Sequence, residues 1–275
     1  MADGDPLAGL NDIDWARLNC AYGDGRRVAT VLRLLASDKA SDADAAWDQL
    51  NDQFLWHQGS VYAATVAAVR FLVAITAREA THRRPRLVSY LALLSLARES
   101  KESPAFAQQV RDAVRRELPS LRDLLNTTDR GLGLSVAELV AALPFDMPHG
   151  IELVARLLAV EPNSRIRAAL CGTSASLGDQ SPTVLTALQK IEAESVRPGY
   201  RLPGGLTVLP PKERLAAGKV AQPLEEIATL PIFSAITQWA GAASPGQEDE
   251  SFFDAARLVN TLFNEAAGNV VWAAP

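Results

Sequence analysis

Residues 41–77 have the sequence SDADAAWDQLNDQFLWHQGSVYAATVAAVRFLVAITA, and this stretch decides the fold. It predicts two helices joined by a turn of three or four residues at Gly59. Ser41 followed by Asp44 resembles a capping box and marks the start of the first helix, while Ser60 is predicted to cap the second. Neither helix can hide its apolar surface within the pair alone. Neighbouring pairs must therefore stack on both sides, as they do in repeat proteins.

The second helix of this pair should be buried over most of its circumference. The residues that predict this are Val61, Thr65, Ala68, Val69, Leu72 and Ile75. Hydrophobic residues make up 48% of the 275-residue chain and aromatic residues only 6%, a balance that favours close-packed helices over a β-sandwich. We therefore expect an all-α protein, a right-handed α-solenoid of stacked antiparallel helix pairs.

Periodic apolar segments continue on both sides of the organising pair. Helices are expected at about 25–36, 83–98, 104–118, 131–143, 148–160, 164–177 and 182–194, and a short helix should follow Pro119 and end near Asn126. The pair Ser103-Pro104 is a start signal for one of them. Upstream, Trp15 and Leu18 are neighbours at i,i+3 and should plug the end of the first pair.

Residues 196–212 interrupt this rhythm, with four prolines and three glycines in 17 residues. Such a composition predicts a long irregular loop. The chain is thus predicted to comprise a solenoid with a helical cap at 1–195, this loop, and C-terminal helical repeats with a cap at 213–275. Arg197, Tyr200 and Arg201 make the loop a candidate contact segment. A linker between two subdomains explains it equally well.

Residues 162–188, PNSRIRAALCGTSASLGDQSPTVLTAL, resemble a HEAT-type repeat. The resemblance places Arg165 or Arg167 near the start of the first helix of the repeat and closes that helix at Leu177-Gly178. It covers one repeat well and weakens elsewhere to apolar helices of suitable length.

A second, narrower resemblance is to an N-terminal pattern of bacterial HEAT-like proteins. It is carried by Asp14-Trp15, Ala21-Tyr22-Gly23, His57 to Tyr62, Ala64-Thr65 and Phe71-Leu72. Arg70 stands where those proteins commonly have a proline before Phe-Leu, which removes the basis for a kink there. Some HEAT-like solenoids are immunity proteins against bacterial toxins, so the resemblance implies a protein that works by binding another protein.

Two sets of side chains are candidates for binding. His57, Gln58 and Tyr62 lie at the helix–helix turn, where solenoids often present contact residues. The alternative for His57 and Gln58 is a hydrogen bond to the free carbonyls that end the preceding helix. The second set is a central excess of arginine, since residues 53–130 hold 12 basic and 7 acidic residues.

The arginines of this central patch are Arg83, Arg84, Arg86, Arg98, Arg111, Arg115, Arg116 and Arg122. Arg111 and Arg115 are i,i+4 neighbours and are expected to face largely outward. A solvated outer face is the default explanation for such a patch. An acidic protein partner or a nucleic-acid backbone are the alternatives, although the net charge of −5 disfavours a general nucleic-acid binder.

No catalytic motif stands out, so we expect a non-catalytic protein without a cofactor. An enzyme whose site is assembled from dispersed residues is a further alternative. The three histidines are scattered, which disfavours a metal site. The acidic N-terminus does not have the pattern of a signal peptide, and no apolar run is long enough to span a bilayer. Cys20 and Cys171 are isolated thiols that we expect in buried helical positions. We therefore expect a cytoplasmic protein that binds another protein, with its oligomeric state left open.

Overall fold

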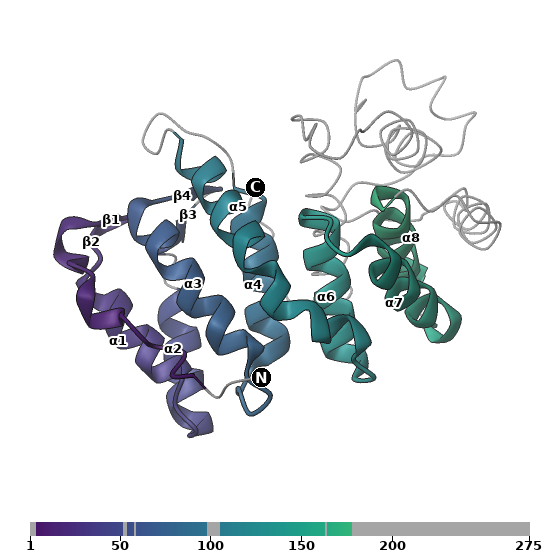
Figure 1. Ribbon diagram of the computed structural model, residues 1–275, viewed down its shortest axis with the longest axis horizontal. Coiled ribbons are helices and arrows are strands. Elements are labelled where there is room, and N and C mark those ends of the chain that lie inside the picture. The colour runs from purple at the N-terminus through teal and green to yellow at the C-terminus, as the bar shows by residue number, and fades with distance from the viewer. Residues whose placement is uncertain (1–3, 52–53, 58, 98–104, 163, 178–275) are drawn as a thin grey trace, which may run out of the picture. The chain divides into compact units, whose positions relative to one another are not determined.

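The computed structural model describes residues 4–51, 54–57, 59–97, 105–162 and 164–177, and this part of the chain is mostly helical (Figure 1). Its strands form two antiparallel hairpins, each made of two-residue strands. The prediction of an all-α protein is confirmed. One compact unit ends at Leu139 and a second begins at Val140, inside the helix Arg130–Ala142.

The first unit contains 3-10 helices, α-helices and both hairpins. In chain order these elements are η1 (Leu10–Asp12), η2 (Trp15–Arg17), β1 (Asn19–Cys20), β2 (Gly23–Asp24), α1 (Arg26–Leu35), α2 (Ala40–Asn51), β3 (Trp56–His57), β4 (Ser60–Val61), α3 (Ala63–Ala77), α4 (Arg84–Ser95), α5 (Phe106–Glu117) and η3 (Leu118–Asn126). Then follow α6 (Arg130–Ala142), which contains the sequence boundary between the units, and α7 (Met147–Val160) and α8 (Ser164–Ser176) of the second unit.

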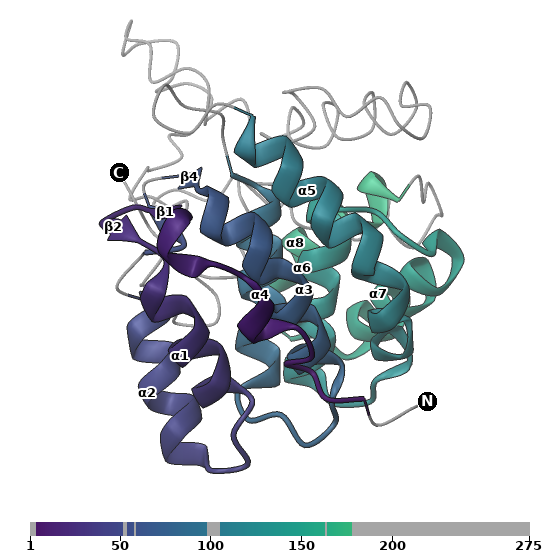
Figure 2. The ribbon, with the colours of Figure 1, turned by 60° about the vertical axis from the view of Figure 1, so that its left-hand side comes forward.

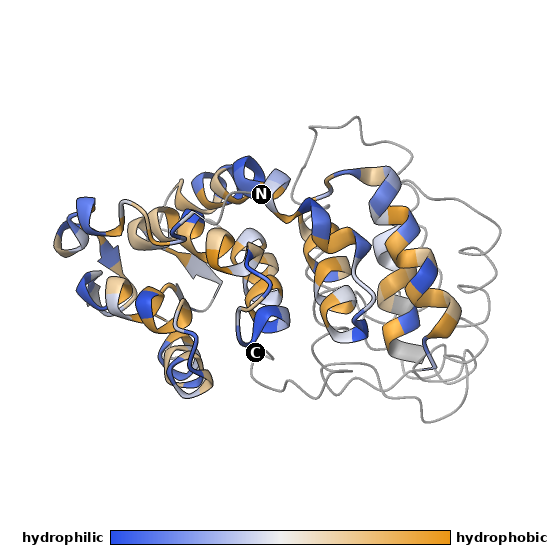
Figure 3. Ribbon diagram, turned by 60° about the horizontal axis from the view of Figure 1, so that its bottom comes forward, coloured by the Kyte–Doolittle hydropathy of each residue, from blue (hydrophilic) through white to orange (hydrophobic). Residues whose placement is uncertain are grey.

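Helix α3 is the centre of the first unit. It packs against α1, α4, α5, η3 and β1, and it lies between α1 and α5 (Figures 1 and 2). All six residues predicted to be buried in or next to this helix are buried, together with Ala64, Phe71, Val73 and Thr76. Helices α1 and α5 on either side of it are amphipathic, and Figure 3 shows apolar and polar residues along the helices of the protein.

The start of α3 has one polar partner from strand β1 and one from its own first turn. The backbone N–H of Ala63 donates to Oδ1 of Asn19 at 3.2 Å, and the N–H of Tyr62 donates to the hydroxyl of Thr65 at 3.0 Å. That hydroxyl donates in turn to the carbonyl of Leu55. The bonds of Thr65 are buried, so its hydroxyl takes the place that water has at an exposed helix start, while the bond from Asn19 lies at the surface.

The end of α3 is satisfied in the same way. The hydroxyl of Thr81 donates to the carbonyl of Ile75 at 2.6 Å. The guanidinium of Arg84 donates through Nε to the carbonyl of Thr76 at 2.8 Å and through Nη2 to that of Ala77 at 3.0 Å. A cation at this end of a helix also interacts favourably with the helix dipole.

Other apolar positions follow the predicted spacing. In α1 the buried residues include Val28, Val31, Leu32 and Leu35, and in and after α4 they include Leu87, Tyr90, Leu91, Leu94 and Leu96. The expected short helix that follows Pro119 is η3, which ends at Asn126 as predicted. In the second unit α7 packs against α8.

Two predicted helix starts are wrong. The first helix of the organising pair begins at Ala40, before Ser41, and Ser37 donates its hydroxyl to Asp42 at 2.7 Å. Ser60 does not cap α3, because it belongs to β4 and pairs with His57 of β3. A hairpin of two-residue strands therefore replaces the expected simple turn.

The alternation of side chains explains this hairpin. Trp56 and Val61 are paired and buried, while His57 and Ser60 are paired and half-buried, which is the period of two expected of strands. Gly59 has φ 85°, a conformation that glycine adopts without the steric cost of a Cβ atom.

Trp15 packs where the sequence predicted a plug. It is buried, its Nε1 donates to the carbonyl of Leu10 at 3.0 Å, and its ring centroid lies 6.2 Å from that of Phe71 in α3. Leu18, its predicted partner, is half-buried. The N-terminal segment therefore covers part of α3.

Both cysteines are buried and neither forms a disulfide, as predicted, but Cys20 lies in strand β1 and not in a helix. Burial, with a smaller effect of Asp24, raises the pKa of Cys20 to about 11. Such a thiol is protonated at neutral pH and therefore a poor nucleophile.

Several predictions fall outside the described residues. Ser103 and Pro104 are among them, and α5 begins two residues later, at Phe106, with Ala105 before it at φ 66°. The predicted helix at 182–194, the loop at 196–212 and the repeats at 213–275 also lie outside, as do both predicted segment boundaries.

Replacing Leu72 tests the position of α3. Leu72 is 1% exposed, so Leu72→Ala should lower the free energy of unfolding by about 2–5 kcal/mol, because it leaves a cavity among packed helices. Val160→Ala is the control, since Val160 is 71% exposed and should cost less than about 0.5 kcal/mol. Urea denaturation followed by circular dichroism measures both. A cost for Leu72→Ala as small as that of the control would contradict the central position of α3.

Gly25 offers a second test, because backbone approaches it closely. A Cβ atom there would lie 2.9 Å from the carbonyl oxygen of Trp15 and 3.3 Å from Cβ of Ala64. Gly25→Ala should therefore destabilise the protein by about 1–3 kcal/mol through overpacking. At Gly131, near the start of α6, the nearest contact of a Cβ atom would be 3.4 Å, so Gly131→Ala should be neutral or stabilising. Equal unfolding free energies for the two variants would refute the close approach at Gly25.

Candidate functional site

The two hairpins lie side by side, next to the start of α3. The N–H of Ala21, in the turn of the first hairpin, donates to the carbonyl of Phe54, which precedes the second hairpin, at 3.0 Å. Asn19 of β1 binds the first residue of α3, as described above. Each hairpin is too short to be stable alone, and their mutual contacts and those with α3 hold them in place.

Tyr22 and His57 meet across the two hairpins. The hydroxyl of Tyr22 lies 3.0 Å from Nδ1 of His57, and the two rings are 5.1 Å apart between centroids in an edge-to-face arrangement. Tyr22 is 68% exposed, which is unusual for so large a ring. Tyr22 and His57, with Ser60 beside His57 in the ladder, are called the hairpin surface below.

The structure separates the three residues predicted at the turn. His57 is half-buried and its side chain reaches Tyr22, 35 residues away in sequence. Tyr62, directly before α3, is only 6% exposed, so the structure buries this predicted contact residue. Gln58 lies outside the described residues.

Arg83 connects α4 to α2. Its Nε donates to Oδ1 of Asp44 at 2.6 Å, and this hydrogen bond holds the pKa of Asp44 below its usual range. Arg83 itself has φ 58°, a left-handed conformation, directly before α4. In the same helix Arg86 lies 5.6 Å from the centre of the Trp47 ring, in a cation–π contact.

Arg111 is buried, which corrects the prediction that it faces outward. It is 7% exposed, its Nη1 donates to the carbonyl of Ala97 at 3.0 Å, and its Nε and Nη2 donate to the side-chain oxygen of Gln108 at 3.2 and 3.1 Å. A buried guanidinium must be hydrogen-bonded, and these partners account for its inward position. Arg115, one turn later, pairs with Asp112 at 3.3 Å and is partly exposed.

The predicted arginines therefore do not form one site. Arg83 forms an ion pair with Asp44 of α2, and Arg84 donates to the last carbonyls of α3. Arg111 is buried, and Arg115 pairs with Asp112 of its own helix. Arg197, Tyr200 and Arg201, the candidates in the loop, lie outside the described residues.

The described ranges hold no metal-binding cluster and no helix that could span a membrane. In them no group of three or more histidine, cysteine, aspartate or glutamate side chains could hold a metal ion. None of the helices within these ranges combines the length and the apolar character needed to cross a bilayer.

Sequence analysis named Tyr22 only within the pattern of bacterial HEAT-like proteins and not as a binding residue. The signal was present, because a tyrosine followed by Gly23 between two polar residues, Asn19 and Asp24, is typical of a tight turn. The partnership with His57 was not visible, since it joins two turns that meet only in the folded chain.

Comparisons of the chain with protein-family models, with curated proteins and with solved structures find no match.

The ion pair between Arg83 and Asp44 predicts a specific response to acid. Because the pKa of Asp44 is lowered in the folded state, its contribution to stability is present above the pKa of an unfolded aspartate, about 3.9, and is lost as the pH falls through the lower folded value. Asp44→Asn should thus lose less stability than the wild type between about pH 5 and pH 2. Asp14→Asn removes a carboxylate from the more exposed pair with Arg17 and serves as the control. Urea denaturation across this pH range gives the answer, and identical pH profiles for wild type and Asp44→Asn would contradict the role of the pair.

Proposed function

We propose that this chain is a non-catalytic protein-binding module, built as a right-handed solenoid of HEAT-like helix pairs. The packing of the first unit supports the solenoid. Helices adjacent in sequence pack as the pairs α1–α2 and α3–α4, and α3 packs against the first helices of the neighbouring pairs, α1 and α5. Stacking through equivalent helices is what a repeat architecture requires.

The exposed ring of Tyr22 on the hairpin surface is the observation that carries the proposed binding function. Tyrosine combines a large apolar ring with a polar hydroxyl and loses little entropy when it binds, so it is common at interaction hot spots. His57 restrains the ring from one side, while the surrounding hairpins fix its backbone. Binding to a side chain that is already positioned costs less ordering entropy.

A protein partner is preferred to a nucleic acid because most of the central arginines already serve the fold. Arg84 and Arg111 donate to backbone carbonyls, Arg83 and Arg115 form ion pairs, and Arg86 lies over an aromatic ring. Phosphate binding would have to compete with these contacts. The net charge of −5 also disfavours binding to a nucleic-acid backbone.

The most concrete form of this proposal is an immunity protein that neutralises a bacterial toxin by binding it. This form rests on the resemblance of the sequence to bacterial HEAT-like proteins. The hairpin surface would then contact the toxin, with Tyr22 at the centre of the interface.

Affinity purification from the native host, with the tagged chain as bait, tests the proposal. We expect a partner that is retained by the wild type and by Arg116→Ala, a control at an exposed position of α5. Tyr22→Ala should weaken retention by about tenfold or more, as truncation of a hot-spot residue does. Tyr22→Phe keeps the ring and should retain more partner than Tyr22→Ala does.

The identified partner then tests whether this chain is an immunity protein. Its expression alone should arrest growth, and co-expression of the wild type should restore growth where Tyr22→Ala does not. Equal retention by wild type and Tyr22→Ala would refute the hairpin surface. A partner that is harmless when expressed alone would refute the immunity function but leave protein binding in place.

A further inference from the structure

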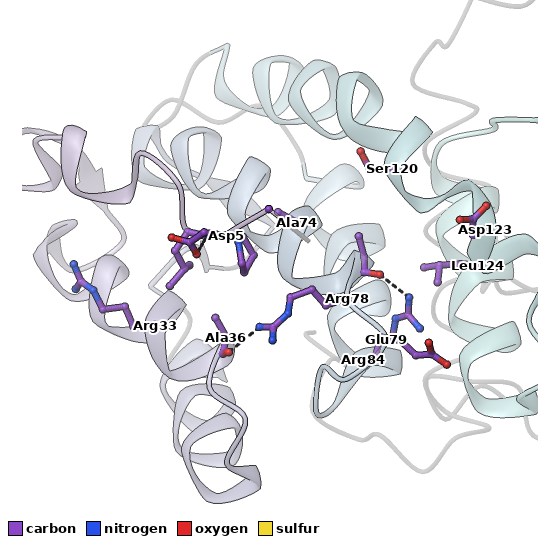
Figure 4. Close-up of a pocket in the computed structure, with 14 residues that line it drawn as sticks. Asp5, Arg33, Ala36, Ala74, Arg78, Glu79, Arg84, Ser120, Asp123 and Leu124 are labelled. Carbon is purple, nitrogen blue, oxygen red and sulfur yellow. Dashed lines mark hydrogen bonds between the residues drawn. The ribbon is translucent and has the colours of Figure 1, made fainter. Parts of the chain in front are cut away.

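A cavity of about 800 Å³ lies at the other end of α3 (Figure 4). Its walls come from the ends of α1 and α3, the start of α4, η3 and the N-terminal residues 4–7, all within the first unit. This volume is within the range of small-molecule sites. It shares no residue with the hairpin surface.

Three arginines line the cavity, and other parts of the chain hold each of them. Arg84 donates to the last carbonyls of α3, Arg78 donates through Nη1 to the carbonyl of Ala36 at 3.0 Å, and Arg33 donates through Nη2 to the side-chain oxygen of Asn11. A guanidinium has five N–H donors, so these bonds fix each group and leave other donors available among the described residues.

The charges of these arginines are not equally balanced. Arg78 pairs with Asp38 at 3.2 Å, whereas within the described ranges Arg33 and Arg84 form no ion pair. Arg84 is also half-buried, and burial lowers its pKa, an effect that the nearby charge of Glu79 partly opposes. Burial removes water that would otherwise hydrate the charged guanidinium of Arg84. An anion bound next to Arg84 would stabilise the charged form in place of that water.

We propose that this cavity binds a carboxylate group, which Arg84 engages through its remaining N–H donors, with Arg78 as the second cation nearby. A carboxylate matches the planar fork of a guanidinium. The carboxylates of Asp5, Glu79 and Asp123 also line the cavity, so a dianionic phosphate would be repelled more than a single carboxylate.

The carboxylate could belong to a free small acid or to an aspartate or glutamate side chain of a bound peptide. Titration of isotope-labelled full-length protein, followed through the Nε–H signals of its arginines, can distinguish these sources. The probes are glutarate, a short glutamate-rich peptide and inorganic phosphate. We expect saturable shifts of the Arg84 signal, with glutarate binding as well as the peptide if the source is a small acid, and with the peptide binding more tightly if it is a protein side chain.

Two variants and two controls make the test specific. Arg84→Gln should weaken binding of the better probe by about tenfold, the usual effect of removing a charged hydrogen bond. Since Arg84 also caps α3, Ala74→Leu provides a variant that leaves the cap intact and fills the cavity from its α3 wall, and it should weaken binding to the same extent. Arg116→Gln changes an exposed arginine outside the cavity and should bind normally.

Tyr22→Ala should also bind normally, which separates this proposal from the function proposed for the hairpin surface. Three results would overturn the carboxylate site. They are tighter binding of phosphate than of either carboxylate probe, unchanged affinity in both Arg84→Gln and Ala74→Leu, and the absence of a saturable shift with any probe.

Discussion

Helix α3 is buried on nearly every side, so its neighbours must supply apolar contacts around it and polar partners at both of its ends. The apolar contacts come from α1, α4, α5 and η3. At the ends, Asn19 and Thr65 satisfy backbone N–H groups, and Thr81 and Arg84 satisfy carbonyls. The bonds of Thr65 are buried, and a group left unsatisfied there would cost about 1–3 kcal/mol.

Both candidate sites depend on this helix. The hairpin surface stands at its first turn, where Asn19 of the first hairpin binds the start of α3. The cavity lies at its last turn, where Arg84 binds the final carbonyls and also lines the wall. A site attached to the most buried helix is held in a fixed geometry, which suits recognition without large rearrangement.

Apolar spacing predicted the helices of the first unit well, because burial on one face of a helix repeats every three to four residues. The partners of polar residues were harder to predict. Arg111 resembled a surface charge, and it is buried because Ala97, beyond its own helix, offers a carbonyl. The contact of His57 with Tyr22, like the burial of Tyr62, depends on two hairpins that meet only after folding. Sequence patterns report local periodicity, and these contacts are not local.

Hydrogen exchange of the native protein tests the central position of α3 most directly. Amides in residues 68–75 should be among the slowest to exchange, because only global unfolding would expose them to solvent. Amides of the two hairpins and of the solvent-facing side of α2 should exchange faster, through local opening. Exchange of residues 68–75 at the rate of the hairpin amides would show that α3 is not the element on which the rest of the first unit is built.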